Sequence, residues 1–422
     1  MDAIVFILEH PYLFEAIMKY HTFYKIVIIN KKSIADRQQL KSVFDEVIIV
    51  NNIHNDNEID CAMTAILANR KIRAIYGSYE SALEIAGRVR SKFGIPGMSE
   101  KDTLNVRNKV RMKNIIAQHG IPTAGFKVIK SIQDRFAFIN SLRNPVVIKP
   151  VDGFATKYTC KIESCRDLFS FQAIRAMTRH KAFLAETFID GAEYHCDSVV
   201  VDGKVMIAAV AKYLNNCLDT INFKKPSGSI FYPSLCDDDD MINKIKSLNK
   251  QAVKHLNIQN AVCHMEAFID KQGNAIFGEI TPRIGGSPHM GECINNIYGI
   301  DVHEAFVDVE MHNYEPEIQT KSVFTGWISF PSKQGKVIEI SREEDFSDVE
   351  GVVKVRIYNK VGDKISRRKN TTIRTGYIII EDVDHKRLLE KLYDAYGRFQ
   401  LGRQGDGGIV LWERIGEFKQ HW

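Results

Sequence analysis

The first ninety residues alternate between short apolar runs and amphipathic segments. The apolar runs predict strands at residues 3–8, 25–29, 45–50 and 72–76, and the segments around them predict helices at 11–20, 59–68 and 78–90. Strands that alternate with helices are typical of a parallel, doubly wound sheet. No GxGxxG motif follows the first strand, so we predict a domain that shapes a substrate crevice and does not bind a dinucleotide.

The rest of the chain changes gradually to mostly strand. A turn at residues 93–97 precedes one or two predicted helices over 99–119. A strand at 126–129, a helix at 134–140 and a strand at 145–149 lead into a β-loop-β unit that returns at 158–162. Further strands are predicted at 183–189, 193–201, 205–213, 323–330, 336–340, 352–359 and 371–380, and helices at 241–256, 300–311 and 384–399. This pattern predicts an α+β region after the α/β domain.

Composition limits the class of protein. With 422 residues, 45% hydrophobic and 26% charged, the chain has room for two or three ordinary globular domains. A net charge of +5 without a basic block does not indicate nucleic acid binding. The eight cysteines form no CxxC pair, which argues against a zinc ribbon and favours a reducing compartment. The first apolar run is too short for a signal peptide or a membrane span, so we expect a cytoplasmic protein that contacts no membrane.

Two glutamates are predicted to face each other in a hairpin. The run at 262–289 contains two apolar segments separated by Lys-Gln-Gly-Asn, which is a hairpin signal. Pairing of residues 270 and 275 across a four-residue loop sets these opposed pairs: Phe268 with Phe277, Glu266 with Glu279, and His264 with Thr281. Like charges in direct opposition destabilise a sheet, and Mg²⁺ can offset them because it takes carboxylate oxygens.

The alternative for this glutamate pair is a solvated surface. Arg283 and the glycines at 285 and 286 follow the hairpin directly. They supply an anion-binding side chain and a loop that a ligand can approach closely. This context favours a metal–phosphate site.

The order of these parts resembles the ATP-grasp superfamily. Within it, the chain is most similar to the carboxylate–amine ligase branch that includes the L-amino acid (dipeptide) ligases. The resemblance runs from about residue 60 to about residue 340 and rests on segments that occur in this order: Gly-Ile-Pro-Gly-Met-Ser at 94–99, Arg-Asn-Lys at 107–109, Gly-Ile-Pro at 120–122, Val-Ile-Lys-Pro-Val-Asp-Gly at 147–153, Glu-Thr-Phe-Ile-Asp-Gly-Ala-Glu at 186–193, His-Met-Glu at 264–266 and Gly-Glu-Ile-Thr-Pro-Arg-Ile-Gly-Gly at 278–286.

The resemblance implies an ATP-grasp architecture. An N-terminal doubly wound domain would occupy 1–95, and the ATP-grasp domain 96–315, with a small lid subdomain at about 122–190 and a large subdomain at about 190–315. A mostly antiparallel α+β region would follow at 316–422.

The resemblance also implies a role for each site residue. The cofactor-binding set for ATP comprises Lys109 and Lys149 on the phosphates (Lys149 also near the adenine), the closing loop with Asp152, Gly153, Thr156 and Lys157, the adenine-reading segment Glu186, Thr187, Phe188 and Ile189, and Glu193 on the ribose. Glu266, Glu279 and Thr281 would hold Mg²⁺, with Mn²⁺ as an alternative ion. Arg283 would stabilise the acyl phosphate and the tetrahedral intermediate. By its position beside Glu266, His264 is either a general base or a structural histidine.

Two positions depart from the family pattern. The loop after Lys149 carries Phe154, Ala155 and Tyr158 where the family has more small residues. Thr281 stands where the family often has a metal-binding asparagine, and a hydroxyl is the poorer ligand.

We therefore expect an ATP-dependent ligase that joins a small carboxylate, an amino acid by preference, to an amine through an acyl phosphate. Its partners would be small molecules, and the resemblance suggests a homodimer. Three alternatives stay open: a carboxylase that activates bicarbonate, a nucleotide-binding protein without turnover, and a phosphotransferase or synthetase that acts on a phosphorylated metabolite.

Overall fold

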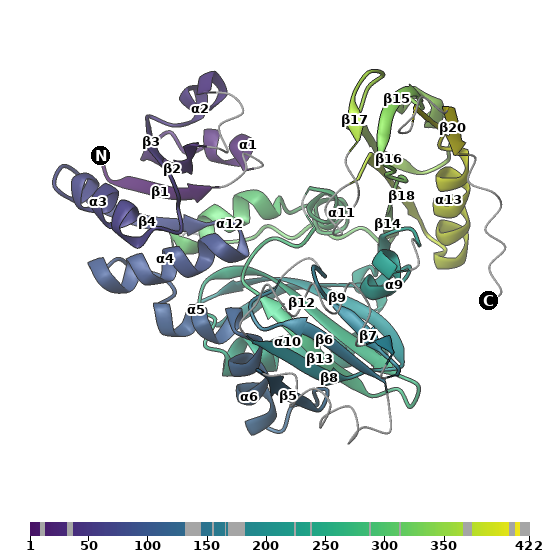
Figure 1. Ribbon diagram of the computed structural model, residues 1–422, viewed down its shortest axis with the longest axis horizontal. Coiled ribbons are helices and arrows are strands. Elements are labelled where there is room, and N and C mark those ends of the chain that lie inside the picture. The colour runs from purple at the N-terminus through teal and green to yellow at the C-terminus, as the bar shows by residue number, and fades with distance from the viewer. Residues whose placement is uncertain are drawn as a thin grey trace.

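The computed structural model describes residues 1–8, 13–31, 37–130, 145–153, 156–164, 166–167, 182–222, 225–236, 239–286, 288–311, 314–365, 374–404 and 410–413. Figure 1 shows an N-terminal α/β domain on the upper left, a central sheet below it, and the C-terminal strands on the upper right. No helix in the described ranges is long and apolar enough to cross a membrane.

The N-terminal domain is the predicted doubly wound sheet. Its four parallel strands lie in the order β3-β2-β1-β4, with bounds β1 Ala3–Leu8, β2 Tyr24–Asn30, β3 Glu46–Val50 and β4 Ile72–Gly77. Alternate residues of these strands face opposite sides. One face packs on α1 (Phe14–Met18) and α2 (Arg37–Val43), and the other on α3 (Asp56–Leu67) and α4 (Glu80–Phe93).

Helix α4 starts later than the sequence predicts. Its N-cap is Tyr79 and not Ser78, and no side chain caps the first turn. The cause is the close packing of the helix on the strand before it. A Cβ added at Gly77 would lie 2.5 Å from the carbonyl oxygen of Ala82, so the chain must turn sharply before the helix begins.

A second sheet has four antiparallel strands in the order β5-β8-β6-β7, at the position where the small subdomain was predicted. The strands are β5 Phe126–Ile129, β6 Val146–Pro150, β7 Cys160–Ile162 and β8 Phe183–Thr187. The predicted β-loop-β unit is the β6–β7 pair, whereas the helix predicted at 134–140 lies outside the described residues. Two helices precede this sheet, α5 (Glu100–Arg107) and α6 (Lys109–Gln118), because Asn108 interrupts the helix and caps α6 with its side chain.

The large sheet is antiparallel throughout, in the order β13-β12-β9-β10-β11-β14-β18-β16. Its strands are β9 Gly191–Val201, β10 Lys204–Tyr213, β11 Gly228–Phe231, β12 Ala261–Asp270, β13 Ala275–Thr281, β14 Phe324–Ser329, β16 Val352–Ile357 and β18 Gly376–Asp382. The sheet therefore continues from the central part of the chain into the C-terminal region. Helices α9 (Cys217–Asn222) and α10 (Asp240–His255) belong to the same part of the chain.

Two helices join the N-terminal domain to the large sheet. They are α11 (His289–Tyr298), which the sequence did not predict, and α12 (Val302–Glu310). Tyr76 of β4 donates its hydroxyl to the carbonyl of Val307 at 2.8 Å, and Arg90 of α4 pairs with Glu310 at 2.9 Å. These contacts hold β4 and α4 of the N-terminal domain against α12 (Figure 1). Helix α11 has two asparagines and a glycine, so burial of its apolar side overrides its weak local propensity.

The C-terminal region adds a third antiparallel sheet in the order β17-β15-β19-β20. Its strands are β15 Gly335–Ile340, β17 Lys364–Ile365, β19 Leu401–Gln404 and β20 Val410–Glu413, with helix α13 at His385–Arg398. The mostly antiparallel character predicted for this region is confirmed.

The predicted hairpin forms, but with a corrected register. Glu266 does pair with Glu279 and His264 with Thr281, whereas Ala267 pairs with Phe277, and Phe268 pairs with Ile276. The loop is shorter than predicted, since the amide of Asp270 donates to the carbonyl of Asn274. Gly273 takes a φ of +78° in this loop. A bulge between Glu266 and Ala267 shifts the register back, so that the glutamates still face each other.

The bulge requires a glycine at position 278. A Cβ there would lie 2.6 Å from the carbonyl oxygen of Glu266. We predict that Gly278→Ala lowers the free energy of unfolding by about 1–3 kcal/mol, because the strands must separate to admit the methyl group. Urea unfolding measures this change. The control is Gly397→Ala in α13, where a Cβ would meet nothing within 4 Å. Equal stability of the two variants would contradict the close approach.

Candidate active site

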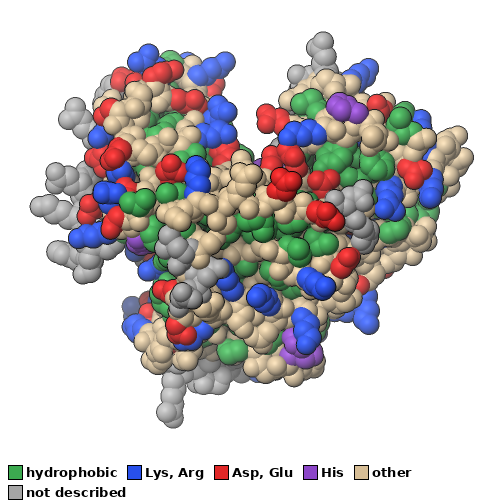
Figure 2. Space-filling view, turned by 180° about the vertical axis from the view of Figure 1, so that it is seen from behind, with side chains coloured by type: hydrophobic (Ala, Val, Ile, Leu, Met, Phe, Trp, Pro, Cys, Tyr) green, Lys and Arg blue, Asp and Glu red, His purple; other side chains and the backbone are tan. Residues whose placement is uncertain are grey.

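A cleft of about 1650 Å³ lies between the two sheets of the central region, the start of α4 and the strands of the C-terminal region. All the predicted site residues line it except Asp152, which is exposed, and Thr281, which is buried in β13 opposite His264. Seen from behind, the molecule is hollowed between its two upper lobes, with charged side chains on both sides of the hollow (Figure 2).

Lysines and glutamates alternate along one wall of the cleft. Lys149, near the end of β6, places its Nζ 2.7 Å from Glu186 Oε2 and 3.8 Å from Glu279 Oε2. Lys109 is the first residue of α6, and its Nζ lies 3.1 Å from Glu279 Oε2 and donates to the carbonyl of Gly153 at 2.8 Å. Lys113, one turn further along α6, lies 2.7 Å from Glu186 Oε1.

The ion pairs determine the protonation states of these lysine and glutamate side chains. Burial by itself would raise the pKa of Glu186, but Lys113 and Lys149 lower it below its ordinary value. Lys109 and Lys149 likewise outweigh burial and lower the pKa of Glu279 to about 2. Burial lowers the pKa of Lys113, whereas the carboxylates raise that of Lys149. Both glutamates are therefore carboxylates at neutral pH.

The opposed glutamates present oxygen ligands to the cleft. Oxygen atoms of Glu266 and Glu193 and the Cys217 sulfur lie within 4.8 Å of one another. Burial and the charge of Glu266 raise the pKa of Glu193 to about 8, although the backbone N–H of Cys217 donates to it at 2.6 Å. Carboxylates held together in this way on β9 and β12 fit a hard divalent cation, which would neutralise their charge.

The remaining residues predicted to bind the nucleotide lie where the sheet that contains β8 connects to the large sheet. Thr187 ends β8, and its amide donates to the carbonyl of Gly125 at 2.8 Å, while the amide of Phe188 donates to that of Pro145 at 2.9 Å. Phe188 also lies under the ammonium of Lys161, 4.1 Å from the ring centre. Together with Ile189, these residues form the strap between β8 and β9 along the cleft.

The loop after β6 is described only in part. Thr156 has a φ of +56° and Tyr158 a φ of +61°, so the chain bends sharply there without a glycine. Thr156 and Lys157 line the cleft. The carbonyl of Asp152 accepts a hydrogen bond from Arg107 at 3.2 Å. Phe154 and Ala155 lie outside the described residues.

The N-terminal domain holds Arg283 in place. Arg283 Nε donates to Glu80 Oε1 at 2.7 Å, and its Nη1 donates to the carbonyl of Ile284 at 2.9 Å. Glu80 opens helix α4 and is 6% exposed. Burial would raise the pKa of Glu80, but Arg283 and Arg107 lower it. The two residues are 203 positions apart in sequence, so this contact could not be found from the sequence.

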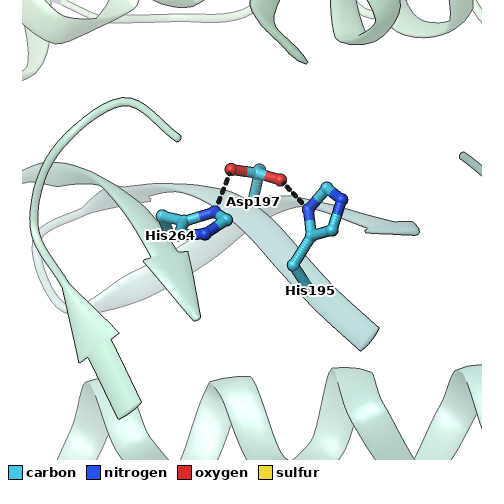
Figure 3. A group of neighbouring side chains, drawn as sticks. All are labelled: His195, Asp197 and His264. Atoms are coloured by element: carbon cyan, nitrogen blue, oxygen red, sulfur yellow. Dashed lines mark hydrogen bonds and ion pairs between the residues drawn. The ribbon is translucent and has the colours of Figure 1, made fainter. Parts of the chain in front are cut away.

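His264 belongs to a buried hydrogen-bond chain. Figure 3 shows Asp197 between two imidazole rings, with one carboxylate oxygen toward each. Its Oδ1 lies 2.9 Å from His264 Nδ1, and its Oδ2 lies 2.6 Å from His195 Nδ1. His264 Nε2 is 3.7 Å from Glu266 Oε1. Burial lowers the pKa of His264, but Asp197 overcomes this and raises it to about 9.

The chain continues to the opposite wall of the cleft. Trp327 Nε1 donates to Ser229 Oγ at 2.7 Å, and Ser229 Oγ lies 2.9 Å from His195 Nε2. Burial lowers the pKa of His195, and the carboxylate of Asp197 can only accept, so Nδ1 of the neutral ring carries the proton and Nε2 accepts from the serine hydroxyl. His195 then donates from Nδ1 to Asp197. Asp197 accepts from both imidazoles, which turns Nε2 of His264 toward Glu266.

Sequence reasoning missed several residues of this site, among them Lys113, Asp197, His195 and Glu80. Lys113 gave a signal, since it lies four residues after Lys109 and shares its face of the helix. Glu80 gave none, because its partner Arg283 comes from another domain. His195 and Asp197 stand two residues apart on one predicted strand, so they share a face, which is a signal that could have found the pair.

Two family models match the chain. One is the ATP-grasp domain, over residues 142–290, and the other is the L-amino acid ligase C-terminal domain 2, over 327–402. The first contains Lys149, Glu186, Glu266, Glu279 and Arg283.

Relatives and solved structures agree with these models. An L-arginine-specific L-amino acid ligase of Bacillus subtilis is 25% identical over 335 residues, which cover 78% of this chain and 79% of the relative. An alanine–anticapsin ligase of B. subtilis strain 168 is 22% identical over 67% of this chain and 65% of its own length. The crystal structure of an L-amino acid ligase from Bacillus licheniformis aligns with a TM-score of 0.79 at 19% identity, over 96% of this chain and 99% of that one.

A more distant likeness concerns the fold alone. The biotin carboxylase domain of the Hydrogenobacter thermophilus 2-oxoglutarate carboxylase, solved with MgADP and bicarbonate, aligns with a TM-score of 0.68 at 18% identity, over 95% of this chain and 91% of that one. The C-terminal region of the present chain matches the model of the L-amino acid ligase C-terminal domain 2. The chain therefore belongs to the ATP-grasp ligases, with an ATP-grasp domain followed by the C-terminal domain of the L-amino acid ligases.

Proposed function

We propose that this ADP-forming carbon–nitrogen ligase joins two amino acids, or an amino acid and another small carboxylate, by an amide bond. The observation that carries the proposal is the cleft in which two opposed glutamates, a row of lysines and Arg283 meet. The likeness to amino acid ligases along most of the chain supports the substrate class.

The first step is phosphoryl transfer from ATP to the substrate carboxylate, which gives ADP and an acyl phosphate. A carboxylate is a poor electrophile, and the acyl phosphate supplies a good leaving group. The protein contributes positive charge where the phosphates lie, through Lys109 and Lys149. Glu266 and Glu279 would hold Mg²⁺, which neutralises phosphate charge when it is bound. Thr281, buried in β13, would be at most a supporting ligand.

The nucleotide would lie along the strap between the two sheets. Glu186, Thr187, Phe188 and Ile189 border this part of the cleft, and Glu193 lies next to them at the start of β9. The backbone of the strap would read the adenine edge, and Glu193 would accept hydrogen bonds from the ribose. The loop with Asp152, Gly153, Thr156 and Lys157 would close over the triphosphate and exclude water.

The second step is attack of the amine on the acyl phosphate, with release of phosphate. Arg283, held by Glu80, would neutralise the oxyanion of the tetrahedral intermediate. His264 would take the proton that the attacking ammonium must lose. Asp197 orients this imidazole and raises its pKa to about 9, so His264 carries a proton at neutral pH and can accept the ammonium proton only in its deprotonated fraction, which grows as the pH rises toward 9.

The direct test is phosphate release from ATP and Mg²⁺ with amino acids supplied singly and in pairs, with mass detection of products. The expected result is release that depends on a pair, with a product lighter than the pair by one water. Release that instead depends on bicarbonate would favour the carboxylase. ATP binding without release for any pair would favour a protein without turnover.

The metal assignment predicts the behaviour of Glu279→Gln. The amide keeps the size of the side chain but removes the negative charge that would bind the cation. We expect phosphate release to fall at least about a hundredfold. The urea midpoint checks that the variant is folded, and near-normal release in a folded variant would refute this role of Glu279.

The role of His264 can be separated from a structural one with two nucleophiles. Hydroxylamine is a weak base and is already neutral near pH 7, so it attacks an acyl phosphate without a proton acceptor. In His264→Asn the amide can still donate to Asp197. We expect dipeptide formation to fall on the order of a hundredfold, with little change in hydroxamate formation at the same pH. A parallel fall of both products would make His264 structural.

A further inference from the structure

Five side chains of alternating charge form one continuous chain in the cleft: Lys113, Glu186, Lys149, Glu279 and Lys109. The successive distances between nitrogen and oxygen are 2.7, 2.7, 3.8 and 3.1 Å. The side chains are between 2% and 24% exposed. Charges at such depth persist only when they are paired, so each glutamate holds a lysine on either side.

This chain occupies the groups that the proposed reaction needs. The carboxylate of Glu279, assigned above to the cation, is shared by Lys109 and Lys149. The ammonium groups assigned to the phosphates are in turn held by carboxylates. A free cation on Glu279 would take the carboxylate away from Lys109 and leave Lys149 to Glu186. A nucleotide without a cation would have to compete with both carboxylates for the lysines.

We propose that this chain couples metal binding to nucleotide binding. Lys109 and Lys149 stand in for the cation on Glu279 in the ligand-free protein. They change partners together when the cation and the triphosphate arrive as one unit, because only that unit replaces both sets of counterions. The proposal rests on the proposed function, since it takes ATP as the ligand.

Lys113 is the positioning residue of this exchange. It is 1% exposed, and its Nζ lies 3.1 Å from Thr123 Oγ1, which donates to the carbonyl of Phe277 at 3.2 Å. Lys113 is thereby anchored to β13 and keeps one oxygen of Glu186 neutralised. Without it, Glu186 would depend on Lys149 for its neutralisation and would hold that lysine away from the phosphates.

The first experiment measures ATP affinity by calorimetry, without amino acids, in EDTA and in Mg²⁺. We expect Glu279→Gln to bind ATP in EDTA about tenfold more tightly than the unaltered protein, because it releases Lys109 from its carboxylate and frees Lys149 from one of its two. Its gain in affinity from Mg²⁺ should shrink by the same factor.

The matched control is Glu266→Gln. It removes the same charge from the opposite strand, where the ion-pair contact is with His264 and not with a lysine. Its affinity for ATP in EDTA should change much less than that of Glu279→Gln. Equal changes in the two variants, or weaker binding by Glu279→Gln, would overturn the exchange of partners.

The second experiment tests Lys113 by a double-mutant cycle with Glu186. We expect Lys113→Met to weaken binding of ATP with Mg²⁺ by about tenfold or more. Adding Glu186→Gln should restore part of the lost affinity, because Lys149 is then released. A purely structural Lys113 would give no such recovery.

The outcomes are distinct from failure of the proposed function. Unchanged ATP affinity in Lys113→Met, or no recovery in the double variant, would remove Lys113 from the exchange. If Lys113→Met does not fold, the comparison of Glu279→Gln with Glu266→Gln still decides the coupling. Absence of ATP binding by the unaltered protein in both buffers would overturn the proposed function and the coupling with it.

Discussion

Two carboxylates held face to face on neighbouring strands are the constraint on which the cleft depends. Glu266 and Glu279 repel each other in this position, and the sheet alone offers no compensation. The structure offsets the repulsion with lysines from outside the hairpin, from α6 and from β6. It also maintains the opposition through a bulge at Gly278, which restores the register after a short loop. The fold thus keeps a repulsive pair of carboxylates beside a row of ammonium groups. This arrangement suits a ligand that carries both positive and negative charge.

The N-terminal domain completes this site from a distance. Helices α11 and α12 pack between its sheet and the large sheet, and this fixes the start of α4 at the cleft. Glu80 then holds Arg283, so that the guanidinium assigned to the oxyanion is set by a domain that supplies none of the proposed metal ligands. Relative motion of the two domains would therefore change the position of Arg283 before it changed anything in the metal site.

A second connection is a buried chain of hydrogen bonds that links two walls of the cleft. The hydrogen bonds from Trp327 through Ser229, His195 and Asp197 to His264 join the C-terminal strands to the neighbourhood of Glu266. Trp327 also lies below the guanidinium of Arg374, 5.3 Å from the ring centre. This wall is where we expect side chains of different substrates to be distinguished, and the chain gives it a rigid link to the proposed proton acceptor.

The sequence alone determined the elements whose patterns are local. The β1 strand, the helix α10, the opposition of Glu266 and Glu279, and the order of lysines and glutamates along the chain all follow from spacing and apolar periodicity. What the tertiary structure decided depends on partners distant in sequence. The pairing of Arg283 with Glu80 and the burial of Lys113 against Glu186 each join elements from different sheets or domains. The bulge at Gly278 depends on how closely the backbones of β12 and β13 approach. A single sequence records which charges exist, but only folding brings them within a few ångströms, where burial makes each depend on its neighbour.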